Sequence, residues 1–316
     1  SYFESELMKV RARPALFIGP IDNDGIFKII CELLDNGVDE HRAGRNNLVH
    51  LWSHNDGSFW VCDDGVGIPV KKHPKANIST LTHVLTALQA SGKMQGNAYT
   101  SSIGTHGVGI KASNALSTSF EVWTYRSDAG GWHYTAFKKG HETVKVQKRK
   151  PPKFASEGYP KRGTVIRMVP DYSLFAKGAR FETATMERWA ELTSFMNKGL
   201  SIKYTSPNGK TRTWMSKNGI VDYLTKRYAE IKKEQDLDPA LPAMSAKPVY
   251  VTSPNLDVTL HFTKVHREHM EFATNTIKND EGGEHEKAFW HALEDSLKPY
   301  AGRNKYKYLD LRDGVI

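Results

Sequence analysis

The sequence predicts a protein of the α+β class, on the strength of one long helix and three hairpins. Apolar residues recur at helical spacing between residues 26 and 42, which predicts an amphipathic helix there. Pairs of β-rich runs separated by turn residues predict the hairpins. We expect the hairpins at residues 47–62, 120–137 and 201–214.

Two domains are expected, because 316 residues is long for one domain and comfortable for two. The sequence changes in character near Lys217, where a helix at 219–228 is followed by a charged stretch that contains prolines. Two strands and a helix at 285–300 come next, which predicts a βαβ-containing second domain. We therefore predict a first domain at residues 1–217 and a second at 218–316, and expect the second to continue beyond the last residue.

The composition is ordinary for a soluble globular protein, with 39% apolar and 25% charged residues. No run approaches the ~20 apolar residues of a membrane span, and the N-terminal stretch lacks the apolar core of a secretory signal, so we expect no membrane association. Cys31 and Cys62 are interpreted as small core residues, which makes a reducing cytoplasm the expected compartment. The net charge of +9 favours anionic partners, nucleic acid first.

Residues 1–20 are predicted to contain a strand-like or turn segment that ends at Gly19 and Pro20. The turn that follows can begin the long helix, with Asp24 as its cap, and Gly44 ends it. The functional interpretation depends on the residues of this helix.

Glu32 and Asn36 lie one turn apart on the helix, so their side chains share a face. Leu33, Leu34 and Val38 fall on the other side and are expected to be buried. A carboxylate in this position can orient and deprotonate an attacking water, and the Asn oxygen can ligate a Mg²⁺ that also holds phosphate oxygens. The alternative is that both side chains are merely solvated, which is commoner for a Glu and an Asn on a helix face.

The stretch CDDGVGIP follows the first predicted hairpin and forms a second candidate feature. Asp63 is expected at a strand end, where its carboxylate can accept a hydrogen bond from an exocyclic amine and so select a purine such as adenine. Gly65 and Gly67 allow a tight turn and a close approach to a ligand. An Asp-Gly turn that leads into a Pro-ended strand is the alternative interpretation.

A helix is expected at residues 78–90, and the small, polar, glycine-containing stretch 91–102 predicts a lid. The run GTHGVG at 104–109 comes next and opens a short helix. A glycine-rich turn of this kind can offer backbone N–H groups and a positive helix end to phosphates. His106 in this run either packs in the interior or touches phosphate.

The stretch from residue 138 to residue 162 is basic, and we interpret it as a solvated connection between strands rather than a DNA-contacting strip. A strand, VIRMVP, follows Thr164. The Thr164 hydroxyl either helps to read a base edge or belongs to an ordinary β-forming residue. A helix at 181–199 completes this part of the chain, and we assign its apolar stripe to the core.

The order of these motifs resembles that of the GHKL ATPase superfamily: ExxxN on a helix, DDGxGIP, a lid, GxHGVG, and Gly-Thr on a strand. The chain is most similar to the ATPase region of type IIA DNA topoisomerases of the gyrase B and topoisomerase IV class. ELLDNGVDE and GTHGVGIKASNALS resemble two motifs of that family, and RPALFIG and TALQASGKM two others. NDEGGEHEKAFWHAL and DLRDGVI carry the resemblance through the second domain.

The resemblance implies a Bergerat-type mixed sheet with helices on one face, followed by a smaller α/β transducer domain with a βαβ core. It implies that Glu32 is the general base and that Asn36 ligates Mg²⁺. It also implies that Asp63 binds the adenine amine of ATP, with Thr164 beside it. The remaining residues expected to bind the nucleotide or to belong to the closing lid are Asp39, Glu40, Gly65, Gly67, Ile68, Lys93, Tyr99, Ser102, Gly104, Thr105, His106, Gly107, Val108 and Gly109.

The function implied by the resemblance is an ATP-hydrolysing gate, which dimerises on binding Mg·ATP and captures a segment of double-stranded DNA. A cleavage subunit or downstream cleavage domains, in the nucleoid or a host-cell cytoplasm, would complete the enzyme. Two alternatives stay open. One is a MutL-like GHKL clamp that cuts no DNA, and the other is a basic nucleic-acid-binding module with a degenerate nucleotide site.

Three departures from the family pattern are expected to matter. Val66 stands where gyrases usually carry Arg, so we expect the ion pair with Glu40 to be absent. Ser91 and Ile103 replace family glycines near the lid. The transducer lysine of the family would follow the last residue, because Lys305 and Lys307 come too early in the motif order, so we expect slow ATP turnover by this chain alone.

Overall fold

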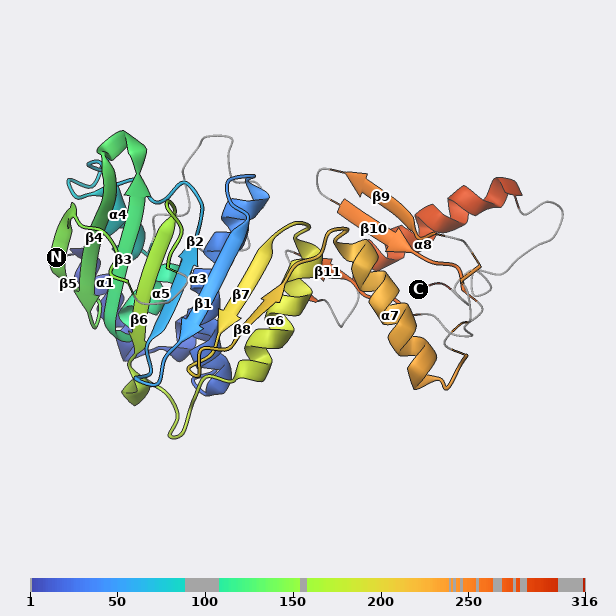
Figure 1. The fold of residues 1–316 in the computed structure, drawn as a ribbon, viewed down its shortest axis with the longest axis horizontal. Coiled ribbons are helices and arrows are strands. Elements are labelled where there is room, and N and C mark those ends of the chain that lie inside the picture. Colours follow the sequence, from blue (N-terminus) through green and yellow to red (C-terminus); the bar gives the residue numbers. More distant parts are fainter. Residues whose placement is uncertain are drawn as a thin grey trace. The chain divides into compact units, whose positions relative to one another are not determined.

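The computed structural model describes residues 2–88, 108–153, 158–238, 240, 243–244, 247–253, 256–263, 269–274, 277–278, 283–300 and 315. The chain divides into two compact units, Ser1–Met215 and Ser216–Ile316 (Figure 1). This division falls two residues before the boundary expected from the sequence.

The larger unit is built on an eight-stranded sheet in the order β5-β4-β3-β6-β2-β1-β7-β8. Among the described strands, β1 and β7 pair in parallel and the other neighbours are antiparallel, which confirms the expected mixed sheet. The three predicted hairpins correspond to β1–β2, β3–β4 and β7–β8. The strand bounds are β1 Leu48–Ser53, β2 Phe59–Asp63, β3 Ser117–Arg126, β4 Gly131–Lys138, β5 His141–Lys148, β6 Thr164–Pro170, β7 Ser201–Thr205 and β8 Thr211–Trp214.

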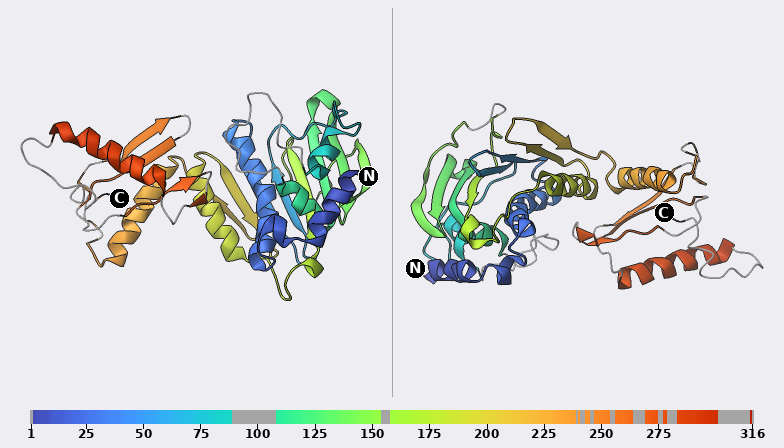
Figure 2. Two further views of the ribbon diagram at one scale, coloured as in Figure 1. Left: turned by 180° about the vertical axis from the view of Figure 1, so that it is seen from behind. Right: turned by 90° about the horizontal axis from the view of Figure 1, so that it is seen from below.

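Helices cover one face of this sheet (Figure 2). The central helix α3 packs on β1 and β2, α5 packs on α3 and α1, and α6 packs on β7 and β8. The helix bounds are α1 Tyr2–Ala12, α2 Ala15–Ile18, α3 Asn23–Arg42, α4 Thr80–Thr86, α5 Gly109–Ala115 and α6 Thr183–Met196, with short 3₁₀ turns η1 Ser127–Ala129 and η2 Tyr172–Leu174. The main apolar core lies between the helices and the sheet.

The segment before Gly19 was wrongly predicted as strand-like or a turn, because it forms the short helix α2, and the helix α1 precedes it. Leu7 and Val10 lie three residues apart on one face of α1 and are fully buried in the main core. Arg11 anchors the same helix by donating to the Ala115 carbonyl and to the Asp171 carboxylate, both at 2.6 Å. Burial against distant elements therefore decides the conformation of this segment.

The long predicted helix is confirmed as α3, but it begins three residues earlier than expected. Its cap is Asp22 rather than Asp24, because the Asp22 side chain accepts a hydrogen bond from the Asp24 backbone N–H at 3.0 Å. Gly37 brings the helix close to the sheet, since a Cβ there would lie 2.6 Å from Val49 Cγ2. The close packing fixes the height of the polar face of α3 above the ends of β1 and β2.

The basic stretch between residues 138 and 162 is not merely a solvated connection, because its first part forms the strand β5. The strand pairs with β4 and has partly buried residues alternating with exposed ones. Glu142 faces the helices and accepts a hydrogen bond from the Thr82 hydroxyl at 2.9 Å. The high density of lysine in β5 hid this alternation at the level of sequence.

The smaller unit contains α7 Ile220–Glu234, β9 Val249–Ser253, β10 Leu256–Leu260, β11 Ala273–Thr274, β12 Ile277–Lys278, α8 Glu284–Leu297 and the 3₁₀ turn η3 Lys298–Tyr300. The α7 helix packs on β10, and its own buried residues are Leu224, Tyr228 and Ile231. Within the described part of this unit the strand pairs are antiparallel, so its βαβ core stays a prediction. Across the described chain, no helix has the length and apolar character that a membrane crossing requires.

Candidate functional site

The polar face of α3 carries Glu32 and Asn36, as the sequence predicts. Asn36 is exposed, and the Glu32 side chain keeps 18% of its surface accessible. Leu33 and Leu34 are buried on the opposite side of the helix. Lys28 lies one turn before Glu32, and its Nζ is 2.7 Å from Glu32 Oε1. The carboxylate is therefore held at the surface of the helix by a cation from the same face.

The first residue of α5 lies directly against the Glu32 carboxylate. A Cβ added at Gly109 would overlap Glu32 Oε2, so any side chain there would have to displace the carboxylate. The two helices are tied together by Ser113, whose hydroxyl donates to the Ile29 carbonyl at 2.7 Å. Residues some 75 positions apart in the chain thus meet at one carboxylate, with Val108 capping α5 beside it.

Asp63 ends β2 and faces Thr164, the first residue of β6, across the sheet. Its Oδ1 accepts a hydrogen bond from the Gly65 backbone N–H at 2.8 Å. Gly163 passes so close that a Cβ there would overlap the Asp63 carbonyl oxygen. Burial raises the pKa of Asp63 to about 7, hydrogen bonds from the Gly65 and Thr164 backbones act against this, and the charge of Glu40 adds to it.

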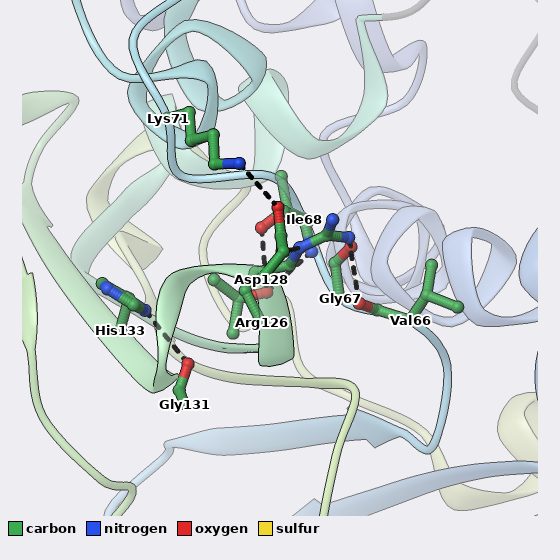
Figure 3. Close-up of polar contacts among 9 residues, drawn as sticks. Val66, Gly67, Ile68, Lys71, Arg126, Asp128, Gly131 and His133 are labelled. Carbon is green, nitrogen blue, oxygen red and sulfur yellow. Dashed lines mark hydrogen bonds and ion pairs between the residues drawn. The ribbon is translucent and has the colours of Figure 1, made fainter.

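The glycine loop after Asp63 is held against β3. Gly67 has a φ of +72°, and a Cβ there would lie 2.7 Å from Thr124 Oγ1. That hydroxyl also accepts a hydrogen bond from the Ile68 N–H at 2.6 Å. Figure 3 shows the Arg126 guanidinium donating to the carbonyls of Val66 and Gly67, at 3.2 Å and 3.3 Å. The loop is therefore held against β3 by contacts within the protein.

The turn between β3 and β4 also helps to hold the segment that follows Asp63 (Figure 3). Asp128 accepts a hydrogen bond from Arg126 Nε at 2.8 Å and lies 3.3 Å from Lys71 Nζ. The Arg126 hydrogen bond and, to a lesser degree, the Lys71 contact lower the pKa of Asp128. Both ends of the segment from Val66 to Lys71 are thereby fixed to one turn.

Glu40 forms an ion pair with an arginine other than the one that the family places at position 66. Arg45 pairs with it at two points, with Nη2 to Oε1 at 2.5 Å and Nε to Oε2 at 2.9 Å. Both side chains are only about a quarter exposed, at 27% for Arg45 and 22% for Glu40. A Cβ on Gly65 would lie 3.1 Å from Glu40 Oε2, so the pair sits directly beside the loop of Asp63. Val66 is 42% exposed and takes no part in this ion pair.

Sequence reasoning missed two residues of the site. Arg45 follows the end of α3, where no periodic signal marks it. Asp35 lies on α3 three residues after Glu32, a spacing that could have found it. Burial, with the charge of Glu32, raises the pKa of Asp35 to about 7, and the Cys31 thiol donates to its Oδ2 at 3.5 Å.

The described residues thus form two groups along one helix. Glu32 and Gly109 meet at the middle of α3, and Glu40 meets the Asp63 loop near its C-terminal end, about 12 Å further along at 1.5 Å per residue. Asn36 and Asp39 lie on the two turns between them. Of the expected site residues, Lys93, Tyr99, Ser102, Gly104, Thr105, His106 and Gly107 lie outside the described residues, as do Ser91, Ile103, Lys305 and Lys307.

A metal ion would depend on a bound ligand for most of its coordination. Within the described part of the chain, no group of three or more His, Cys, Asp or Glu side chains could hold one. Asn36 is exposed and offers one amide oxygen. This fits Mg²⁺, which usually keeps one or two protein ligands and takes the rest from phosphates and water.

Comparison with known proteins gives one family and a consistent set of relatives. Residues 21–172 match the family described as histidine kinase-, DNA gyrase B-, and HSP90-like ATPase. The chain is similar to the DNA gyrase B protein of Mycoplasmoides gallisepticum, with 34% identity over 313 residues that cover 95% of this chain and 46% of that protein. It is also similar to the DNA topoisomerase 4 B protein of Caulobacter vibrioides, with 32% identity over 93% of this chain and 42% of that protein. The chain therefore spans about half the length of the curated relatives it matches.

Among solved structures, the chain is similar to the 43K ATPase domain of Thermus thermophilus gyrase B, which was crystallised in complex with an aminocoumarin. The TM-score is 0.78 and the identity 27%, over 98% of this chain and 79% of that one. The topoisomerase IV ATP-binding domain of Francisella tularensis shares the fold, with a TM-score of 0.71 and 24% identity over 95% of this chain and 75% of that one. These likenesses confirm the predicted fold class.

Proposed function

Residues 21–172 make the chain a member of the histidine kinase-, DNA gyrase B- and HSP90-like ATPase family, and on this premise we propose that it binds and hydrolyses ATP on the polar face of α3. One observation carries the proposal: a single helix presents a carboxylate against Gly109 at its middle and borders the Asp63 loop near its C-terminal end. We place the phosphates of an extended nucleotide near Glu32 and its base near Asp63.

At the phosphate end, Glu32 acts as the general base. Its carboxylate is partly exposed and held by Lys28 at 2.7 Å, so it can accept a proton from a water placed beside the terminal phosphate. Asn36 lies one turn further along and supplies a ligand for Mg²⁺, which when bound neutralises charge on the phosphate oxygens. Gly109 lets the chain approach these oxygens without a side chain in the way.

At the base end, Asp63 accepts a hydrogen bond from the exocyclic amine of adenine. Its carboxylate must be ionised to accept freely, and its pKa of about 7 makes that state sensitive to its neighbours. Thr164 lies directly across the sheet and offers a hydroxyl to the same ring. Gly65 and Gly67 let the loop pack closely against Asp63 and β3, where a side chain would collide with the protein itself.

The wider role that we propose is that of an ATP-operated gate in a type II DNA topoisomerase. Binding of Mg·ATP would join two copies of the chain around a segment of double-stranded DNA, and hydrolysis would release it. A cleavage subunit or cleavage domains would supply strand passage. Two relatives, the B proteins of a gyrase and of a topoisomerase 4, are similar over more than 90% of this chain and support this role.

Calorimetry with a non-hydrolysable ATP analogue and Mg²⁺, run beside sizing chromatography, tests the proposal. We expect one analogue bound per chain and a dimer that forms only when the analogue is present. A protein with neither binding heat nor nucleotide-dependent thermal stabilisation would instead be a basic nucleic-acid-binding module. A clamp that closes on ATP but supports no strand passage with a cleavage subunit would correspond to the MutL-like alternative.

A further inference from the structure

The sheet face opposite the helices carries a groove that the ATP site does not use. Along β1, Val49 and Leu51 point into the main core, so His50 and Trp52 must point to the other face. Lys203 of β7 is the register partner of His50 and lies on that same face. Residues of these strands and of the segment 158–162 line an open groove of about 430 Å³.

The groove is positively charged. Lys161, Arg162 and Lys203 line it, and Asp64 is the acidic residue among its lining residues. The Asp64 carboxylate is partly exposed, and its Oδ1 accepts hydrogen bonds from the backbone N–H groups of residues 47 and 48 at 2.9 Å and 3.0 Å. Three cations against one internally bonded carboxylate leave an excess of positive charge that favours an anion.

His50 shapes this groove without adding charge to it. It is buried, it stacks on Trp52 with ring centroids 3.4 Å apart, and its Nε2 lies 2.8 Å from Thr205 Oγ1. Burial, with the charge of Lys203, lowers the pKa of His50 to about 3, so the ring is neutral at pH 7. The floor is therefore rigid and neutral, and the positive charge is carried by the lysines and the arginine.

The cations are displayed at the surface rather than enclosed. Lys161 and Arg162 are exposed, and Lys203 is half-exposed. Arg162 is anchored at its base, because its Nε donates to the Asp64 carbonyl at 3.0 Å. An open groove with fixed charges at the surface suits a repeated anion on a long partner better than a small anion, which would need an enclosing pocket.

We propose that this groove contacts the phosphate backbone of double-stranded DNA, on the side of the sheet away from the nucleotide. The inference rests on the proposed function only in taking DNA as the partner. It assigns part of the basic stretch that the sequence left as a solvated connection, namely Lys161 and Arg162, to a surface completed by Lys203 some 40 residues later.

The test compares two double variants that remove equal charge. Lys161→Ala with Lys203→Ala removes two of the three cations of the groove, and Lys177→Ala with Lys198→Ala removes two exposed lysines that do not line it. Binding of a short labelled duplex, without nucleotide, is measured by anisotropy over a range of salt. We expect the groove variant to reduce the slope of log K against log salt by about 1.8, at about 0.9 per lost phosphate contact, and the control to leave it unchanged.

Equal losses in the two variants would overturn the proposal, because net charge rather than the groove would then drive binding. An unchanged slope in the groove variant would overturn it as well. If inorganic phosphate competed at the groove and the groove variant still bound the duplex normally, the groove would be assigned to a small anion instead. Calorimetry with the ATP analogue on the same variants distinguishes the two proposals. If the DNA measurements contradict the groove while the variants bind the analogue normally, the proposed ATP site is unaffected.

Discussion

Arg45 pairs with Glu40 through two contacts, of 2.5 Å and 2.9 Å, beside the loop that carries Asp63. The sequence resemblance predicted that the usual ion pair to Glu40 from position 66 would be absent, because Val66 occupies the position of the usual arginine. The cation is instead supplied from just beyond the end of α3. Arg45 offsets the negative charge of Glu40. That charge lies next to Asp63 and opposes the ionisation of the Asp63 carboxylate.

Arg45→Ala should weaken binding of the ATP analogue. The unpaired Glu40 would raise the pKa of Asp63 further and loosen the loop at Gly65, at a cost of about 1–2 kcal/mol, or roughly five- to thirty-fold in Kd. Titration calorimetry measures the change. The double variant Arg45→Ala, Val66→Arg is the matched control, because it returns a cation from the other side of Gly65 and should recover part of the affinity. Unchanged affinity in Arg45→Ala would contradict the role given to this pair.

Replacement of the carboxylate next to Gly109 should separate binding from chemistry. We expect Glu32→Ala to bind the ATP analogue with nearly normal affinity and to lose ATP turnover by about 10²–10⁴-fold, because the proton acceptor for water is removed. Calorimetry and a phosphate-release assay on the same preparation give the two quantities. Glu182→Ala, which changes an acidic residue near the start of α6, is the control and should keep normal turnover. Normal turnover in Glu32→Ala would rule out the assignment of the base.

Affinity for adenine nucleotides should rise with pH near neutrality. Asp63 has a pKa of about 7 in the free protein, so it is mostly protonated below that pH and mostly ionised above it. Because the ionised carboxylate is the better acceptor for the adenine amine, Kd should fall as the pH increases from about 6 to about 8. Calorimetry across this range measures the effect. Asp63→Asn should bind weakly with a flat profile, and a wild-type profile as flat as that of the variant would exclude titration of Asp63 as the cause.

Gly109→Ala should damage the phosphate end of the site alone. A methyl group there would overlap Glu32 Oε2 and displace either the carboxylate or the start of α5. We expect turnover to fall at least tenfold, with little change in thermal stability, because Glu32 is partly exposed and can move aside. Ser113→Ala is an informative comparison, since it loosens α5 from α3 without blocking Glu32 and should lower stability more than turnover. An active Gly109→Ala enzyme would show that the close approach is not required.

Much of the local structure was predictable from short-range patterns. The polar face of α3 follows from the spacing of Glu32 and Asn36, and the end of β2 at Asp63 follows from a β-rich run stopped by glycine. The turn residues Asp56 and Gly57, which lie between β1 and β2, predicted that these two strands pair. Helical periodicity and turn chemistry act over a few residues, so they are visible in the order of amino acids.

Other features depend on partners that are distant in the chain. The helix α1 forms because Leu7 and Val10 find a core made by later elements, and β5 forms because β4 offers an edge to pair with. The parallel pairing of β1 with β7 places Lys203 beside His50, which no local pattern foretells. Asp35 acquires its raised pKa only from burial next to Glu32.

The sequence by itself determined the local placement of the residues to which we assign the chemistry: an acid and an amide one turn apart, an acid at a strand end, and the glycines that follow it. Tertiary structure alone decided what surrounds them, namely the glycine that meets Glu32, the arginine that neutralises Glu40, and the cations that share one groove. The physical reason is one of range. Backbone preferences are set by immediate neighbours, whereas burial and charge depend on every element that packs nearby.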